Sequence, residues 1–167
     1  MHDTGATEIY GRFWFISQLL RSGVEVARPE RDLGVDLLAY TSNASWMLPI
    51  QLKTIGLNGL TVFNKYVGEP VALAYVLLGD QDGGNAGRTH TNAYLLTPEE
   101  AWDLPTALGQ KFDPGSHTTY RFSSLTRPLV EKLEAHRVQP GQWRERLELL
   151  APLRRLLPAV DWPGLNS

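Results

Sequence analysis

The chain has 167 residues, 43% of them apolar, and its 16 basic and 18 acidic side chains give a net charge of −2. These values are typical of one folded domain with a sizeable core. The chain contains no cysteine, which excludes disulfide frameworks, cysteine zinc sites and thiol nucleophiles. The charge balance gives no support to nucleic-acid binding, since nucleic-acid binders usually carry a basic face.

No segment of the sequence resembles a secretory signal or a membrane-spanning helix. The first residues lack the basic stretch and apolar run of a secretory signal. The longest apolar run, residues 71–78, is far shorter than the roughly 20 residues that a membrane helix needs. We therefore expect a cytoplasmic protein that does not cross a membrane, which agrees with the lack of cysteine.

The first predicted element is a helix over residues 4–22, followed by Gly23 as a stop signal. Its large apolar side chains recur at offsets of four, three and four residues, at Ile9, Phe13, Ile16 and Leu20. These offsets put the four side chains on one face of an amphipathic helix. Such an apolar stripe normally faces the core of a globular protein.

Strands are predicted after this helix, where apolar and β-branched residues alternate or form short runs. The candidate stretches are residues 24–28, 35–40, 46–54, 60–66, 71–78 and 93–96. Only a short polar turn separates the second stretch from the third, so we expect these two to form an antiparallel hairpin. The run 71–78 is continuously apolar, as in a strand that is buried on both faces.

Helices are predicted again after the strands. Thr97 and Glu100 form a capping box around Pro98, which occupies the first helical position. Two further helices are predicted over residues 125–136 and 142–157, with a break or kink in the second at Pro152.

The order of elements is therefore a helix, then strands, then helices. This order predicts the α/β class, with a mixed central sheet flanked by helices. We expect a single domain over residues 1–167, with a core at about 4–104 and a C-terminal helical extension at about 120–158.

Three polar residues interrupt the apolar pattern of the predicted hairpin. Asp36 lies at the start of one strand, and Gln51 and Lys53 lie two residues apart on the next, so that both point to the same face. The hairpin can bring them together across the ladder. Burying such groups is costly unless they pair with each other or hold a metal ion. A purely structural Asp36–Lys53 ion pair is the alternative to a functional site.

The segments Gly34-Val35-Asp36-Leu37-Leu38 and Ile50-Gln51-Leu52-Lys53 resemble the PD-(D/E)XK nuclease superfamily, which includes restriction endonucleases. Its pattern is an acidic residue on one strand, then Glu, Asp or Gln, any residue, and Lys on the next. A helix that carries a glutamate often precedes both strands, and Glu8 matches that position. The resemblance runs from about residue 8 to residue 66 and implies a restriction-endonuclease-like fold.

The resemblance implies metal-dependent hydrolysis of phosphodiester bonds in nucleic acid, with DNA as the expected substrate. Mg²⁺, or Mn²⁺ in its place, would take oxygen ligands from Asp36, Gln51 and the backbone carbonyl of Leu52. Lys53 would orient the attacking water or stabilise the charge of the transition state. Glu8 would be an outer ligand, or would hold a second metal ion or a water. The resemblance also implies that a homodimer is one expected state, because several members of the superfamily cut two strands with two sites.

Several of these assignments have alternatives. Gln51 is a neutral ligand where the commoner residue is a carboxylate, so an inactive domain that binds nucleic acid or protein is the competing hypothesis. Glu8 is also explained as a solvated residue of the first helical turn. Asp32 could reach the metal, but a turn role is favoured. A solvated surface role is likewise favoured for Arg12 and Lys65.

Overall fold

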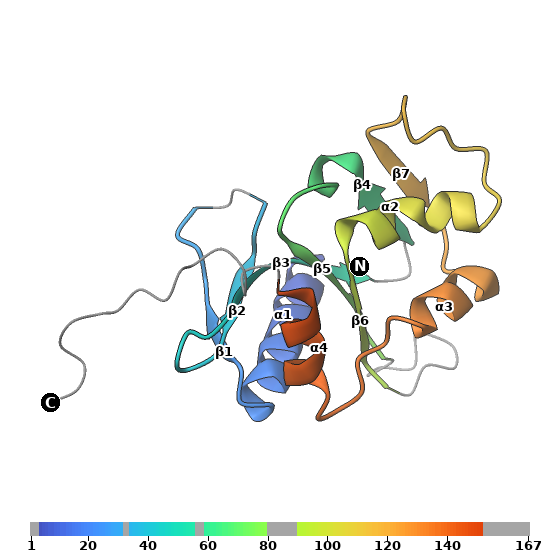
Figure 1. The fold of residues 1–167 in the computed structure, drawn as a ribbon. Coiled ribbons are helices and arrows are strands. Elements are labelled where there is room, and N and C mark those ends of the chain that lie inside the picture. Colours follow the sequence, from blue (N-terminus) through green and yellow to red (C-terminus); the bar gives the residue numbers. More distant parts are fainter. Residues whose placement is uncertain (1–3, 32–33, 56–58, 80–89, 152–167) are drawn as a thin grey trace, which may run out of the picture.

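A computed structural model of the chain describes residues 4–31, 34–55, 59–79 and 90–151. It is a mixed α/β protein with a mixed central sheet, in agreement with the predicted class (Figure 1). In chain order the elements are α1 (Thr4–Arg21), β1 (Glu25–Ala27), β2 (Leu37–Tyr40), β3 (Met47–Ile55), β4 (Leu60–Phe63), the 3-10 helix η1 (Asn64–Tyr66), β5 (Ala72–Leu77), β6 (Asn92–Leu96), α2 (Pro98–Ala107), β7 (Thr119–Phe122), α3 (Arg127–Glu134) and α4 (Trp143–Leu150).

The main sheet has five strands in the order β1-β2-β3-β5-β6. The strands β1, β2 and β3 form an antiparallel meander, which confirms the predicted hairpin. The pairing of β3 with β5 is parallel, and that of β5 with β6 is antiparallel. The β2 register covers residues 47–50 of β3, whereas β5 pairs with residues 50–55. The second half of β3 therefore extends past the start of β2, and this step in the sheet positions the polar residues.

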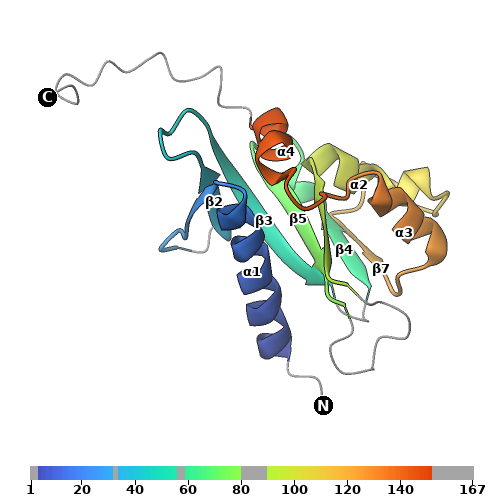
Figure 2. The same ribbon diagram turned by 90° about the horizontal axis from the view of Figure 1, so that it is seen from below.

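Helices cover both faces of the main sheet (Figure 2). On one face α1 and α4 pack through Phe15, Leu19, Trp143 and Leu147. On the other face lie α2, α3 and the two-stranded β4–β7 sheet. All six residues of β5 are buried between the two layers, as its continuous apolar run predicts.

The helix α1 presents a different face to the core from the one that the spacing of its apolar residues indicates. Its buried residues are Gly11, Phe15 and Leu19. The stripe of Ile9, Phe13 and Leu20 is exposed instead, and Ile16 is only partly buried. Leu19 lies about 90° and Phe15 about 130° from the centre of the stripe on the helical surface, since successive residues are about 100° apart. The prediction of the helix is confirmed, but the expectation of a buried stripe is wrong.

The predicted strand over residues 60–66 is shorter than expected and lies outside the main sheet. Only Leu60–Phe63 forms β4, and the chain then turns into η1. Its partner is β7, which lies in sequence that has no clear strand pattern. This small sheet carries the chain from β3 over to the parallel strand β5, and the crossover returns Lys65 and Tyr66 toward β3.

The capping box at the start of α2 is confirmed. The Thr97 hydroxyl accepts a hydrogen bond from the backbone N–H of Glu100, and the Glu100 carboxylate accepts one from the N–H of Thr97. The two C-terminal helices are also present as α3 and α4, each shorter than predicted. Pro152 and the rest of the predicted last helix lie outside the described residues.

Candidate functional site

Asp36 lies at the step between β2 and β3. Its backbone N–H donates to the carbonyl of Ile50 at 2.9 Å, so that the chain is still in register with β3. Its carboxylate oxygen Oδ2 accepts the backbone N–H of Leu52 at 2.7 Å. The side chain thereby takes the ladder position that a longer β2 would have filled. This bond fixes the carboxylate beside the second half of β3.

Gln51 is the buried centre of a short hydrogen-bond chain. Its side chain is 6% exposed, and its amide nitrogen Nε2 donates to the same Oδ2 of Asp36. Its amide oxygen Oε1 accepts the hydroxyl of Tyr66 at 3.0 Å. Both ends of the amide are therefore paired, which offsets the cost of burying it.

Gly34 lies close to this network. Its φ of +85° lies in the left-handed region that glycine adopts most readily. A Cβ at this position would lie 3.5 Å from the Tyr66 ring and 4.0 Å from Oε1 of Gln51. The glycine therefore allows the backbone conformation at this position, and its lack of a side chain leaves space beside Tyr66.

A cavity of about 590 Å³ opens over these residues, and we refer to it as the Asp36 cavity. Its lining residues come from α1, the loop before β2, β3 and η1. They are Glu8, Arg12, Gly34, Asp36, Gln51, Leu52, Lys53, Thr54, Lys65 and Tyr66. Three cationic side chains face two carboxylates, so the cavity has a positive balance although the whole chain is acidic.

Two of the lysines that line this cavity lie near the Phe63 ring. The Nζ atom of Lys53 is 5.7 Å from the ring centroid, and that of Lys65 is 5.6 Å from it. Lys65 also lies 4.8 Å from the ring of Tyr66. Cation–π contacts of this kind hold ammonium groups in place without a carboxylate partner. No ion pair among the described residues involves either lysine, so both charges are available to an anion in the cavity.

Tyr75 lies next to Lys53 in the register of β3 and β5. It is 2% exposed, and this burial raises the pKa of its hydroxyl, with a smaller contribution from Tyr66. Tyr75 is therefore a neutral phenol at physiological pH. It lies in the same core cluster as Tyr66 and contributes no charge to the cavity.

A close approach between α1 and β3 brings Glu8 and Arg12 to the cavity. Gly11 is buried against Thr54, where a Cβ would overlap the threonine side chain. Any larger residue at position 11 would therefore hold the helix farther from the strand. Glu8 and Arg12 lie within one turn of Gly11 and line the cavity beside Thr54.

The structure brings all the residues of the predicted site to one cavity. Glu8, Asp36, Gln51, Leu52 and Lys53 all line it. No ion pair among the described residues joins Asp36 to Lys53. The structural ion pair considered above is therefore not formed. The alternative ligand in the loop before β2, Asp32, lies outside the described residues.

The sequence does not predict the contribution of Tyr66. Arg12 and Lys65 line the cavity, and Lys65 is also exposed, as expected for a solvated residue. Tyr66 reaches Gln51 through the crossover from β3 to β5, and no local pattern in the sequence predicts that path. The β-like composition of residues 60–66 indicated a strand, in which alternate side chains would point to opposite faces. The turn into η1 instead directs Lys65 and Tyr66 toward one cavity.

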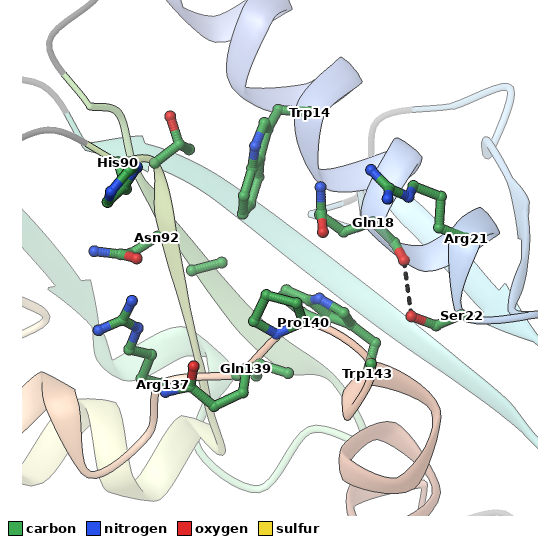
Figure 3. Close-up of a pocket in the computed structure, with 14 residues that line it drawn as sticks. Trp14, Gln18, Arg21, Ser22, His90, Asn92, Arg137, Gln139, Pro140 and Trp143 are labelled. Atoms are coloured by element: carbon green, nitrogen blue, oxygen red, sulfur yellow. Dashed lines mark hydrogen bonds between the residues drawn. The ribbon is translucent and has the colours of Figure 1, made fainter.

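A second cavity, of about 690 Å³, lies between α1, the start of β6 and the segment that follows α3. We refer to it as the Trp14 cavity. In Figure 3, Trp14 and Gln18 project from α1, and His90 and Asn92 lie on the opposite side. Arg21 and Arg137 supply its other cationic groups. None of its lining residues in the described part of the chain is acidic, so this cavity holds no carboxylate ligand for a metal ion.

Within the described residues, no three side chains of the histidine, cysteine, aspartate and glutamate types gather closely enough to hold a metal ion by themselves. A metal in the Asp36 cavity would therefore depend on its two carboxylates together with amide, backbone or water oxygens. Mg²⁺ fits such a set, because it usually keeps several waters and binds through one or two carboxylates and the phosphates of its substrate.

Comparisons with known proteins leave the chain without an assigned family. No protein-family model matches it, and no curated protein matches it. None of the helices in the described ranges combines the length and apolar character needed to cross a bilayer.

Proposed function

We propose that the protein is a metal-dependent nuclease with a restriction-endonuclease-like fold, and that the Asp36 cavity is its active site. The observation that carries the proposal is the meeting of Asp36, Gln51 and Lys53 at the step between β2 and β3. The same cavity also receives Glu8 from α1. DNA is the expected substrate.

Asp36 and Glu8 would hold a Mg²⁺ ion, with the amide oxygen of Gln51 or the carbonyl of Leu52 as neutral ligands. When bound, the ion lowers the pKa of a coordinated water and neutralises charge on the phosphodiester. Only one oxygen of the Asp36 carboxylate accepts the hydrogen bonds from Gln51 and Leu52. These bonds orient the carboxylate, as the supporting shell of a metal site does.

The three cations of the cavity have separate roles in this proposal. The Lys53 ammonium, held near Phe63, stabilises negative charge on the reacting phosphate. Arg12 on α1 and Lys65 on η1 also line the cavity, and in this proposal they bind neighbouring phosphates of the backbone. Such contacts give affinity without reading the sequence. The local positive balance thus compensates for the acidic composition of the chain.

Tyr66 is a positioning residue that acts through Gln51. Its hydroxyl now donates to the amide oxygen, while the amide nitrogen faces Asp36. A half-turn of the amide would let the nitrogen donate to the Tyr66 oxygen and bring the amide oxygen beside Asp36. Tyr66 can pair with either orientation, so the neutral Gln51 can serve as a ligand without leaving a buried group unpaired.

A cleavage assay tests this proposal. Supercoiled plasmid would be incubated with Mg²⁺ or Mn²⁺ and with wild type, Asp36→Asn or Lys53→Ala. Asp103→Asn and Lys132→Ala are matched controls, because these residues are exposed and lie outside the cavity. We expect metal-dependent cleavage by wild type and both controls, and loss of cleavage in the two cavity variants. Equal cleavage by all five proteins would remove the assignment.

A second candidate function is favoured by one observation. The network of Asp36, Gln51 and Tyr66 pairs its polar groups without any metal ion, and the cavity has more cations than carboxylates. A domain that binds nucleic acid or another polyanion without cutting it would also have these properties. DNA binding by wild type that is unchanged by EDTA, together with no cleavage, would favour this function.

A further inference from the structure

The Trp14 cavity has an aromatic wall that the proposed nuclease reaction does not use. Trp14 is partly buried and packs against the core cluster that contains Phe15 and Trp143. Trp143 also lines the cavity, and its ring meets the Phe15 ring edge-on at a centroid distance of 5.1 Å. These core contacts hold the Trp14 ring while part of its surface is left to the cavity. The volume of about 690 Å³ lies within the roughly 300–1,000 Å³ of typical ligand sites.

The lining of this cavity also has hydrogen-bonding capacity that the protein does not use. The indole N–H of Trp14 and the side-chain amides of Gln18 and Asn92 form no hydrogen bond within the described residues. Figure 3 shows Gln18 projecting from α1 beside Trp14. An amide both donates and accepts hydrogen bonds. Such a group next to an aromatic surface suits a ligand whose flat ring carries donors and acceptors on its edge.

The charged side chains of the cavity include an arginine on either side of Trp14 (Figure 3). Arg21 is the last residue of α1, and Arg137 follows α3. No ion pair among the described residues involves Arg21, and the side chain of Arg137 has one contact, with Glu134 at 3.4 Å. None of the described lining residues is acidic. The cavity therefore offers two guanidinium groups to an anion, although the whole chain has a net charge of −2.

We propose that the Trp14 cavity binds a nucleotide, with the base stacked on the Trp14 ring and phosphate bound by arginine. Every base has a flat face that can stack on an aromatic side chain. Gln18 would bind the edge of the base, and a guanidinium group matches the oxygens of a phosphate with several N–H donors in one plane. A fatty acid would leave the amides without partners, and an inorganic anion would leave the ring uncovered. A nucleotide uses the ring, the amides and the cations together.

The same chemistry has two sources, a free nucleotide and a nucleotide within a single strand. A free nucleoside phosphate carries its phosphates on one side of the base, so that only one of the two arginines would bind them. In a strand the backbone continues in both directions from the base, so that both Arg21 and Arg137 would contribute. Binding of a free nucleotide does not depend on the proposed nuclease function. The strand alone rests on that function, as a second contact with the substrate.

Calorimetry in EDTA tests the stacking contact, with AMP and ATP as free nucleotides and a short thymidine oligonucleotide as the strand. Trp14→Leu should weaken binding roughly 10-fold or more, because it removes the aromatic surface. Trp14→Phe keeps a ring and should weaken binding less. Phe13→Leu is the matched control, because Phe13 lies on the same helix, is 67% exposed and does not line either cavity. We expect this control to bind like wild type.

Substitution of the arginines tests the phosphate contacts and distinguishes the two sources. Arg21→Gln and Arg137→Gln are compared with Arg127→Gln, because Arg127 is exposed on α3 and lies outside both cavities. Exposed cations are weak partners, so each effective substitution should weaken binding only about two- to fivefold. One of the two should affect AMP and ATP, and both should affect the oligonucleotide. Arg21 is exposed, so that Arg21→Gln keeps the test decisive if Trp14→Leu does not fold.

Two outcomes would overturn the proposal. One is a wild type that binds neither the free nucleotides nor the oligonucleotide at millimolar concentration. The other is binding that is equal in wild type, Trp14→Leu and Arg21→Gln, which would place the nucleotide outside this cavity. Neither outcome depends on a metal ion or on cleavage, so failure here can be distinguished from failure of the nuclease assignment.

Discussion

Two cavities lie on opposite flanks of α1, and their linings differ in one decisive respect. Both contain cationic side chains, but the Asp36 cavity also contains two carboxylates and the Trp14 cavity contains none among its described lining residues. The larger volume belongs to the Trp14 cavity, at about 690 Å³ against about 590 Å³. The volume of a cavity therefore does not identify the candidate site for metal chemistry. The type and placement of its charged groups do.

The two cavities also differ in how their polar groups are held. Gln51 in the Asp36 cavity is buried, and both of its amide ends are paired. Arg137 in the Trp14 cavity is partly exposed and pairs with Glu134 on the surface, at 3.4 Å. A preorganised network supports catalysis, while partly exposed cations contribute less to binding. Substitutions in the two cavities should consequently have different effects.

The largest expected effect is that of Asp36→Ala. It removes a proposed metal ligand and also leaves the Leu52 N–H and the Gln51 amide without their acceptor. We expect cleavage to fall by roughly 10²-fold or more and stability to fall by about 1–3 kcal/mol. His90→Ala in the Trp14 cavity is the control and should preserve both. Comparable losses in the two variants would break the distinction between the cavities.

The second prediction concerns Gly11→Ala, which should push α1 away from Thr54. Overpacking of this kind costs about 1–3 kcal/mol, and urea denaturation would measure it. Because Glu8 and Arg12 lie within a turn of the contact, substrate affinity should also decrease. Ser17→Ala, on the exposed side of α1, is the control. Unchanged stability in Gly11→Ala would mean that the helix tolerates the added methyl group.

The third prediction concerns Gln51→Glu, which supplies the charged residue that is commoner at this position in the superfamily that the sequence resembles. Without metal, the new carboxylate would face Asp36, so the melting temperature should fall because like charges repel. With Mg²⁺ or Mn²⁺ it should recover, because binding to the folded state stabilises it. Thermal melts with and without metal would measure both changes. A variant whose melting temperature does not respond to metal would argue against a metal site.

A smaller effect is expected for Tyr66→Phe, which removes one hydrogen bond to Gln51 and leaves the ring in place. The expected loss of stability is about 1 kcal/mol. If Tyr66 positions the Gln51 amide, the metal concentration required for half-maximal cleavage should rise, with the maximal rate less affected. Tyr120→Phe is the control, since that hydroxyl bonds Gln110 at an exposed site away from both cavities.

The smallest effect concerns His136, which precedes the segment that lines the Trp14 cavity. Burial and the nearby Arg146 lower the pKa of His136 below 6.5, and Glu100 opposes them. The unfolded chain therefore binds a proton more readily than the folded one. The contribution of neutral His136 to the stability of the folded chain is complete above pH 6.5. It decreases as the pH falls toward the pKa of His136 in the folded chain.

Denaturation of wild type and His136→Gln between pH 7 and pH 5 would measure this difference. We expect the stability of wild type to decrease more steeply with acid than that of the variant. Metal binding at the Asp36 cavity should not differ between the two proteins. Parallel stability curves would mean that His136 does not contribute to the acid response.

The sequence predicted the elements that carry the Asp36 cavity because local rules govern them. Alternation around Gln51 and Lys53 indicated that both face one side of a strand, and the short turn indicated the hairpin with Asp36. Tyr66 could not be predicted, because its position depends on a turn into η1 and on a crossover between distant strands. The strand β7 was missed for a similar reason, since its residues find a partner only in β4.

The error on α1 has a physical cause. Periodicity identifies an apolar face but does not say whether the core or a partner covers it. Gly11, Phe15 and Leu19 are also at helical spacing, and the close contact at Gly11 decides in their favour. A small residue such as Gly11 adds nothing to a count of large apolar side chains. The spacing of large residues therefore indicated the other face of α1.

Calorimetric titration with Mn²⁺ tests most directly that the Asp36 cavity is a metal site. Wild type and Asp36→Asn would be compared, because asparagine keeps an oxygen to accept the Leu52 N–H and so preserves the local fold. His90→Ala would serve as the control for the other cavity. We predict a binding signal in wild type and in His90→Ala that is lost in Asp36→Asn. No signal in wild type, or an equal signal in all three proteins, would contradict this account.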